Sequence, residues 1–172
     1  MFLQHPREAR LAICTAWLAR LALAEAELHR GVGFEAEPRI RALVATPGAA
    51  LLWPGEGAAT AASRADDPPP ILFAVDGTWH QAEKMLRANP SLAALPRIAV
   101  EPDGAGGYGE LRREPAPHCL STLEAVALAL GALERDPARF APMGEAFRRA
   151  VRLQVECTRT RRNPRHRPRT PG

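Results

Sequence analysis

Long apolar runs, paired cysteines and lysine are scarce in this sequence. The lack of long apolar runs and of paired cysteines argues against membrane-spanning and disulfide-rich proteins. No stretch approaches the roughly 18 consecutive apolar residues that a membrane-spanning helix needs. The three cysteines, Cys14, Cys119 and Cys157, are widely spaced and form no Cys-x-x-Cys pair, which argues against a disulfide framework or a zinc ribbon. The N-terminus lacks the layout of a signal peptide. We therefore predict a cytoplasmic protein without a metal site.

The remaining composition is that of one folded domain. The chain has 172 residues, which is long enough to bury a core, and 46% of them are hydrophobic. Much of this fraction is alanine, while aromatic residues contribute only 5%. Such a composition is globular rather than disordered or fibrous.

The positive charge is concentrated at the C-terminal end. Residues 158–172 contain six arginines and no acidic residue, whereas the other 157 residues carry 17 of the 23 basic groups and all 19 acidic ones. We predict a folded domain over residues 1–157 and an arginine-rich, flexible tail over residues 158–172. If the tail binds anything, nucleic acid phosphate is its natural partner, with strong salt dependence.

Apolar runs alternate with helical patterns along the chain. Buried strands are predicted over residues 49–53, 71–75 and 97–100, and helices over residues 7–20, 79–88, 121–134 and about 142–160. In the first helix, the spacing places Leu11, Cys14, Leu18 and Leu21 on one face. Continuous apolar strands are typical of parallel sheets covered on both faces. The pattern predicts an α/β layered domain with a mostly parallel sheet and a ligand site beyond the carboxyl ends of its strands.

Asp76 follows directly on the predicted strand at 71–75. A carboxylate there can hold a ligand amine or hydroxyl group, or accept a proton during catalysis. The alternative is a structural turn, in which Thr78 caps the next helix and Gln81 completes a capping box. Trp79 likewise suits either a ligand wall or the core face of that helix.

A second candidate segment lies before the helix at 121–134. Ser121 and Glu124 have the spacing of a capping box, and the same helix N-terminus presents amides to an anionic ligand group. Arg112 and Arg113 precede it and are candidates for phosphate binding. The residues by themselves thus indicate an α/β ligand-binding domain with an arginine surface suited to RNA.

Several segments, in order along the chain, resemble one family. They are residues 3–8 (Leu-Gln-His-Pro-Arg-Glu), 51–58, 75–86 with Asp-Gly-Thr-Trp at 76–79, 111–115 and 120–125. The sequence resembles the DTW-domain family of tRNA-uridine aminocarboxypropyltransferases. Many members carry a cysteine-rich segment before the first motif, whereas Met1 stands almost at that motif here. Either this is a subfamily without the segment, or the start codon lies further upstream.

The resemblance implies a fold and a reaction. The fold is SPOUT-like, with a deep trefoil knot, and the reaction moves the 3-amino-3-carboxypropyl group of S-adenosylmethionine to N3 of a uridine in tRNA, without a metal. Asp76 is then the base, or else the group that orients the donor. The implied donor-binding residues are Leu52, Gly55, Thr78, Trp79, Ser121 and Thr122, and the implied RNA-binding residues are Arg112, Arg113, Arg165 and Arg167.

Two other functions stay open at this point. One is a related enzyme with a different product, either a SPOUT-class RNA methyltransferase or an aminocarboxypropyltransferase of ribosomal RNA. The other is a non-catalytic RNA-binding protein anchored by the arginine tail. The group that leaves the donor, and the RNA that receives it, distinguish these possibilities.

Overall fold

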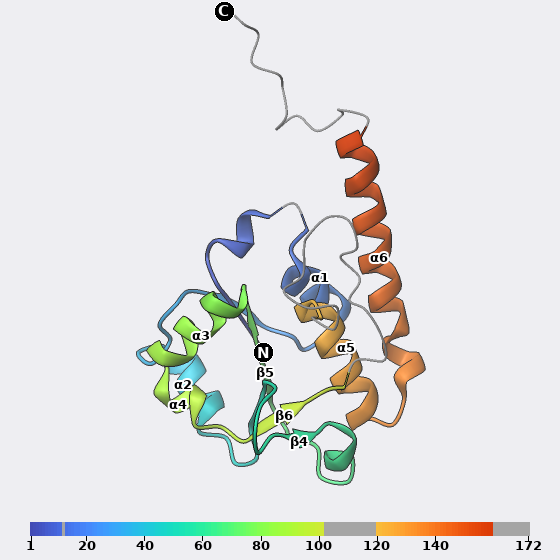
Figure 1. Ribbon diagram of the computed structural model, residues 1–172. Helices are drawn as coiled ribbons and strands as arrows, with labels where there is room; N and C mark the ends of the chain where they lie inside the picture. Colours follow the sequence, from blue (N-terminus) through green and yellow to red (C-terminus); the bar gives the residue numbers. More distant parts are fainter. Residues whose placement is uncertain (12, 102–119, 160–172) are drawn as a thin grey trace, which may run out of the picture.

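The computed structural model describes residues 1–11, 13–101 and 120–159 and contains one six-stranded sheet (Figure 1). The strand order is β2-β1-β5-β3-β6-β4, and all five pairings between these strands are parallel. The strands are β1 (Phe2–Gln4), β2 (Leu28–Arg30), β3 (Ala50–Leu52), β4 (Ala59–Thr60), β5 (Leu72–Asp76) and β6 (Arg97–Ala99). The predicted α/β domain with a mostly parallel sheet is therefore confirmed.

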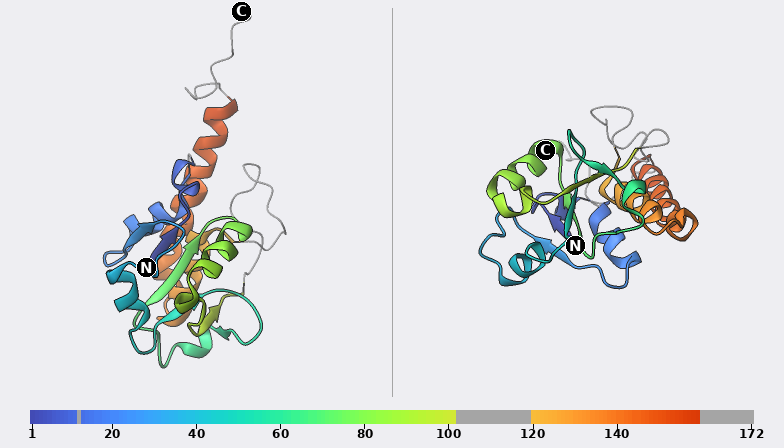
Figure 2. Two further views of the ribbon diagram at one scale, coloured as in Figure 1. Left: turned by 90° about the vertical axis from the view of Figure 1, so that its left-hand side faces the viewer. Right: turned by 90° about the horizontal axis from the view of Figure 1, so that it is seen from below.

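Helices cover both faces of the sheet. They are η1 (Glu8–Arg10), α1 (Thr15–Ala22), α2 (Pro38–Val44), η2 (Ala62–Arg64), α3 (Trp79–Ala88), α4 (Pro90–Ala93), α5 (Thr122–Leu133) and α6 (Pro137–Arg159). The helices α2, α3 and α4 lie on one side, while α1, α5 and α6 lie on the other, and α6 projects beyond the domain (Figures 1 and 2). Within the described ranges, no helix has both the length and the apolar character needed to cross a bilayer.

Successive residues of β1 and β5 are buried in two different hydrophobic cores, one on each face of the sheet. Phe2 and Ala74 are buried on the side of α1, α5 and α6, where they share a cluster with Phe147. Leu3 and Phe73 are buried on the opposite side, against α2, α3 and α4. Because both faces of the central strands are covered, successive residues must all be apolar. This explains why the segment around 71–75 reads as a continuous apolar run.

The predicted helix at 7–20 is wrong in its start. The chain forms the short η1 turn, then becomes extended at Leu11 and again at Cys14, so that α1 begins only at Thr15. Tertiary contacts set this start, because the Thr15 hydroxyl donates to Asp76 and Cys14 Sγ accepts from a side chain of β1. Local periodicity carries no information on such contacts.

The predicted buried face of that helix also differs from the observed one. Leu11 lies outside α1 and is exposed, as is Leu21, whereas Ala16 and Ala19 are completely buried. Small side chains allow α1 to lie close to the sheet; Leu18 is partly buried against the core as predicted, whereas Trp17 and Leu21 are exposed. An exposed apolar strip on α1 is the result.

The last helix starts earlier than predicted. α6 begins at Pro137 rather than near 142, because Asp136 Oδ1 accepts the Arg139 amide at 3.1 Å and a proline fits the first helical position. Pro142 lies inside the helix. Since α6 continues to Arg159, the predicted boundary between residues 157 and 158 falls within a helix.

Candidate functional site

The register of three parallel strands brings three polar side chains to one edge of the sheet. Gln4, the last residue of β1, is paired with Arg30 on β2 and with Asp76 on β5. Each of these residues ends its strand, so the three lie side by side at the carboxyl edge. In parallel α/β sheets, this edge is where ligands bind.

The Asp76 carboxylate is buried and held by three hydroxyl or amide donors. Its side chain is 5% exposed, and Oδ2 accepts from Gln4 Nε2 at 2.8 Å. Oδ1 accepts from the Thr122 hydroxyl at 2.6 Å and more weakly from the Thr15 hydroxyl at 3.4 Å. These donors come from β1, α5 and α1, so the carboxylate orients and joins three elements at the sheet edge.

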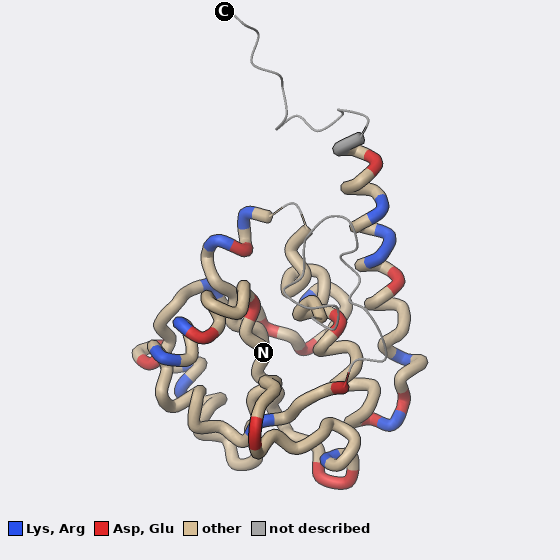
Figure 3. Tube along the Cα trace, viewed as in Figure 1, with Lys and Arg blue, Asp and Glu red and all other residues tan. Residues whose placement is uncertain are grey.

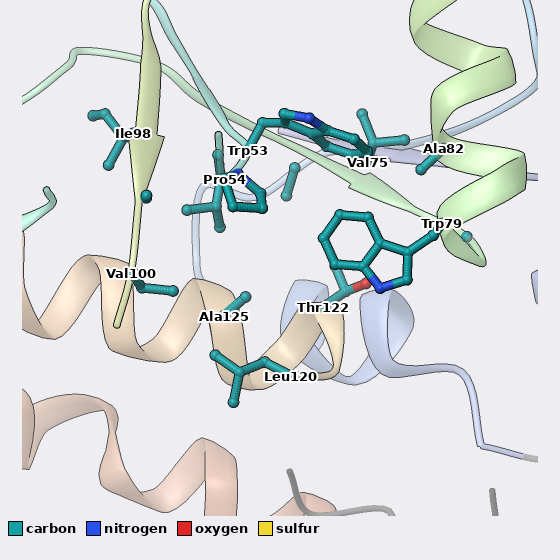
Figure 4. Close-up of a pocket in the computed structure, with 14 residues that line it drawn as sticks. Trp53, Pro54, Val75, Trp79, Ala82, Ile98, Val100, Leu120, Thr122 and Ala125 are labelled. Atoms are coloured by element: carbon teal, nitrogen blue, oxygen red, sulfur yellow. The ribbon is translucent and has the colours of Figure 1, made fainter. Parts of the chain in front are cut away.

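A pocket of about 480 Å³ opens beside this carboxylate (Figure 4). Its walls come from the ends of β3, β5 and β6 and from the starts of α3 and α5. Two tryptophans dominate it: the rings of Trp53 and Trp79 lie 5.3 Å apart between centroids at an interplanar angle of 71°, an edge-to-face arrangement. The Thr122 hydroxyl links this apolar pocket to Asp76.

Three of the six residues predicted to bind the donor, namely Leu52, Trp79 and Thr122, line this pocket. Gly55, Thr78 and Ser121 are not among its described lining residues. Gly55 lies in the loop after β3 with a φ of 143°, a conformation that L side chains rarely adopt.

Thr78 and Ser121 have clear structural roles. The Thr78 hydroxyl accepts the Gln81 amide at 3.3 Å, and the Gln81 side chain accepts the Thr78 amide at 2.7 Å. The Ser121 hydroxyl accepts the Glu124 amide at 3.2 Å, and the Glu124 carboxylate accepts the Ser121 amide at 3.0 Å. Both capping boxes suggested by the sequence are therefore present.

The predicted RNA-binding arginines lie in parts of the chain that the structure does not describe. Arg112, Arg113, Arg165 and Arg167 all lie outside the described residues. In the described part of the chain, no three or more His, Cys, Asp and Glu side chains gather in a way that would hold a metal ion.

One titratable group follows β1 at the same edge. The pKa of His5 is lowered, chiefly by burial and further by the positive charges of Arg7 and Lys84. This shift favours the neutral form of the imidazole.

Sequence reasoning missed Gln4, Trp53 and Val100 as individual site residues. Trp53 and Val100 line the pocket, and Gln4 orients Asp76. Trp53 ends the predicted strand at 49–53 and lies in the family segment 51–58, which was a usable signal. Gln4 carries no such signal, because only the pairing of β1 with β5 places it beside Asp76.

Comparisons with known proteins find relatives that share one name. The chain is 29% identical over 143 residues to tRNA-uridine aminocarboxypropyltransferase 2 of Drosophila melanogaster, covering 80% of this chain and 57% of that protein. It is 28% identical over 141 residues to the protein of the same name from Macaca fascicularis, covering 78% and 47%. It is 35% identical over 83 residues to tRNA-uridine aminocarboxypropyltransferase A of Arabidopsis thaliana, covering 41% and 31%.

The chain thus spans about half the length of the first two relatives. No solved structure matches it significantly. The DTW domain model matches residues 1–155, which includes all five segments that resemble the family. With Asp76, Thr78 and Trp79 of the Asp-Gly-Thr-Trp segment placed at the edge of a parallel sheet beside a pocket, the chain belongs to the DTW domain family.

Proposed function

We propose that this protein transfers the 3-amino-3-carboxypropyl group of S-adenosylmethionine to N3 of a uridine in tRNA. The observation that carries the proposal is the Asp76 carboxylate, which is hydrogen bonded to a threonine of the adjoining pocket. The names of the relatives support the same reaction class and the same kind of RNA.

The pocket suits the donor in size and chemistry. A volume of about 480 Å³ lies within the range of small-molecule sites, roughly 300–1,000 Å³. Trp53 and Trp79 offer aromatic surface for the adenine, and Leu52 adds an apolar wall. The first amides of α5, at the helix start that carries Thr122, are suited to the carboxylate of the donor. Gly55, Thr78 and Ser121 support the loops and helix starts around it.

The reaction needs a positioned acceptor and a route for one proton. S-adenosylmethionine supplies a carbon next to a sulfonium, which is an excellent leaving group and needs no metal. Uridine N3 forms the new bond to this carbon while the carbon–sulfur bond breaks, and the electron pair leaves with sulfur in 5′-methylthioadenosine. The N3–H proton has to leave the acidic imide, and positioning in line is the other main demand.

Thr122 and Asp76 provide that route. The Thr122 hydroxyl lies in the pocket and donates to Asp76 Oδ1 at 2.6 Å. In the proposed step, Thr122 Oγ1 accepts the proton from N3 and passes its own proton to Asp76, which is the final base. Gln4 holds the other carboxylate oxygen, so Oδ1 keeps its direction toward Thr122.

The direct test uses two labelled preparations of S-adenosylmethionine with unmodified tRNA, one labelled in the methyl group and one in the carboxypropyl carbons. Entry of the carboxypropyl label alone is the expected result. Entry of the methyl label would identify a methyltransferase instead, and preferential labelling of ribosomal RNA would change the substrate. RNA binding with neither label transferred would favour a non-catalytic RNA-binding protein.

Replacing Trp79 with alanine should weaken donor binding by roughly 10-fold, because a nucleobase stacked on an aromatic side chain gains about 1–3 kcal/mol. Trp79 is 44% exposed, so its loss leaves the core intact. Isothermal titration with S-adenosylmethionine measures the effect. Trp79→Phe should keep most of the affinity, and Trp17→Ala, on an exposed helix face outside this pocket, should keep all of it. Unchanged affinity in Trp79→Ala would remove the tryptophan from the donor site.

The proposal also includes a knotted fold, an RNA-binding arginine surface, a C-terminal tail and a location in the cell. The SPOUT-like trefoil knot is supported by the all-parallel order of the described sheet and by the family match. Phosphate binding by Arg112, Arg113, Arg165 and Arg167, a tail at 158–172 after the domain at 1–157, and a cytoplasmic location are proposals drawn from the sequence.

A further inference from the structure

A second pocket, of about 330 Å³, lies beyond the carboxyl ends of β1 and β2. It is formed by residues that follow η1, by α1, by the end of β2 and by α6. The lining residues that matter here are Leu11, Cys14, Trp17, Arg30 and Ala150. The proposed chemistry does not use this pocket, so its composition calls for a separate explanation.

A chain of hydrogen bonds joins the two pockets. Arg30 Nε donates to Gln4 Oε1 at 3.1 Å, and Gln4 Nε2 donates to Asp76 Oδ2 at 2.8 Å. Asp76 in turn accepts from Thr122. Arg30 lines the second pocket and Thr122 lines the first, so the chain runs from one pocket to the other through the Asp76 carboxylate. Cys14 also belongs to it, since its sulfur accepts from Gln4 Nε2 at 2.9 Å.

The lining of the second pocket combines exposed apolar surface with a cation. Trp17 is 44% exposed, and Leu11, which lines the same pocket, is exposed as well. Arg30 uses Nε for Gln4, and no hydrogen bond of its two Nη groups is seen within the described part of the chain. None of the described lining residues is acidic. An indole face beside a guanidinium suits a nucleotide, whose base stacks and whose phosphate pairs with arginine.

The surroundings favour the same ligand. η1 and the projecting half of α6 lie at the same end of the molecule, and both carry basic as well as acidic positions (Figures 2 and 3). The exposed arginines on this half of α6 are Arg148, Arg149 and Arg152. A phosphate backbone that crosses this end meets these arginines of α6 as well as Arg30 of the second pocket.

We propose that the second pocket holds a nucleotide of the RNA substrate that neighbours the target uridine. This inference rests on the proposed function, since the target uridine itself must reach the donor beside Thr122. The base of the neighbouring nucleotide stacks on Trp17, and its phosphate pairs with Arg30. Proteins recognise the sequence of RNA chiefly through unpaired bases that are splayed out and stacked on side chains. Through Gln4, the bound nucleotide also steadies the carboxylate that receives the proton.

The experiment measures binding of unmodified tRNA by fluorescence anisotropy at several salt concentrations, without any turnover. Trp17→Ala should weaken tRNA binding roughly 10-fold. Arg30→Ala should weaken it and lower the slope of log K against log salt by about one. Affinity for S-adenosylmethionine should be unchanged in Trp17→Ala. Two matched controls should bind tRNA like the wild type: Leu21→Ala, which is exposed one turn further along α1, and Arg87→Ala, which pairs with Glu83 on α3.

The outcomes separate this inference from the proposed function. Normal tRNA binding by Trp17→Ala overturns the nucleotide pocket, even if the wild type transfers the carboxypropyl group. Weaker tRNA binding by Trp17→Ala supports the pocket, even if no label is ever transferred. A wild-type protein that does not bind tRNA at low salt overturns it too, and a protein partner would then be the better occupant of the exposed tryptophan.

Discussion

Replacing Asp76 with asparagine is expected to lower the rate of transfer to tRNA by about 10²–10⁴-fold. The side chain keeps its shape, but an amide cannot take the proton that Thr122 passes on. Its NH2 group would also face one of the donors that now serve the carboxylate, Gln4 Nε2 or the Thr122 hydroxyl. Transfer of the carboxypropyl label from S-adenosylmethionine under single-turnover conditions measures the loss.

The isosteric change is the right one because Asp76 is buried. Alanine would leave Gln4, Thr15 and Thr122 without their acceptor, and each unsatisfied buried group costs about 1–3 kcal/mol. Such a variant would confuse lost chemistry with lost folding. A melting curve and donor titration of Asp76→Asn should show a folded protein that still binds S-adenosylmethionine.

Threonine 122 provides the matched test of the proton route. Thr122→Val removes the hydroxyl and should lower transfer strongly, whereas Thr122→Ser keeps it and should retain most of the activity. If Asp76→Asn is inactive while Thr122→Val transfers normally, Asp76 acts without the relay. If Asp76→Asn itself transfers at the wild-type rate, the assignment of Asp76 as the base fails.

Phe147→Ala is expected to lower the free energy of unfolding by about 3–5 kcal/mol. Phe147 is completely buried on α6 and belongs to the same core cluster as Leu123 and Val126 of α5. For a domain of this size, the change corresponds to a melting temperature lower by roughly 6–20 °C. Because α5 carries Thr122 at its start, loosening this core also loosens the wall of the donor pocket.

Thermal unfolding followed by circular dichroism measures this effect. Leu153→Ala is the control, since Leu153 is an exposed apolar residue on the same helix. Its substitution should change the free energy of unfolding by no more than about 0.5 kcal/mol. A melting temperature of Phe147→Ala close to that of the wild type would show that α6 does not hold α5 in place.

The fold class was predictable from single segments of the sequence. Continuous apolar runs near 49–53 and 71–75 and a third strand at 97–100 correspond to β3, β5 and β6, and the helix at 79–88 matches α3. Strands buried on both faces must be apolar throughout, so the signal is local. The strands β1, β2 and β4 were not predicted, because each includes a polar residue and none forms a continuous apolar run.

Helix starts were less predictable, because long-range contacts set some of them. The capping boxes at Thr78 and Ser121 are local, and both are present. The start of α1 at Thr15 depends instead on Asp76, which lies far away in the chain. Likewise, the buried face of α1 depends on how closely that helix approaches the sheet. Periodicity alone predicted that the leucines would form this face, whereas Ala16 and Ala19 are the fully buried residues.

The sequence by itself determined the layered α/β class, the Asp76 motif, and the loops that end β3 and β5, because short apolar runs, turn residues and family motifs are local features. Only the tertiary structure decided that Gln4, Arg30 and Asp76 stand side by side, that Thr122 contacts the carboxylate, and that Trp53 meets Trp79. These pairs are far apart in the chain. Their proximity follows from parallel strand register and from the packing of α5 against the sheet, which no local pattern encodes.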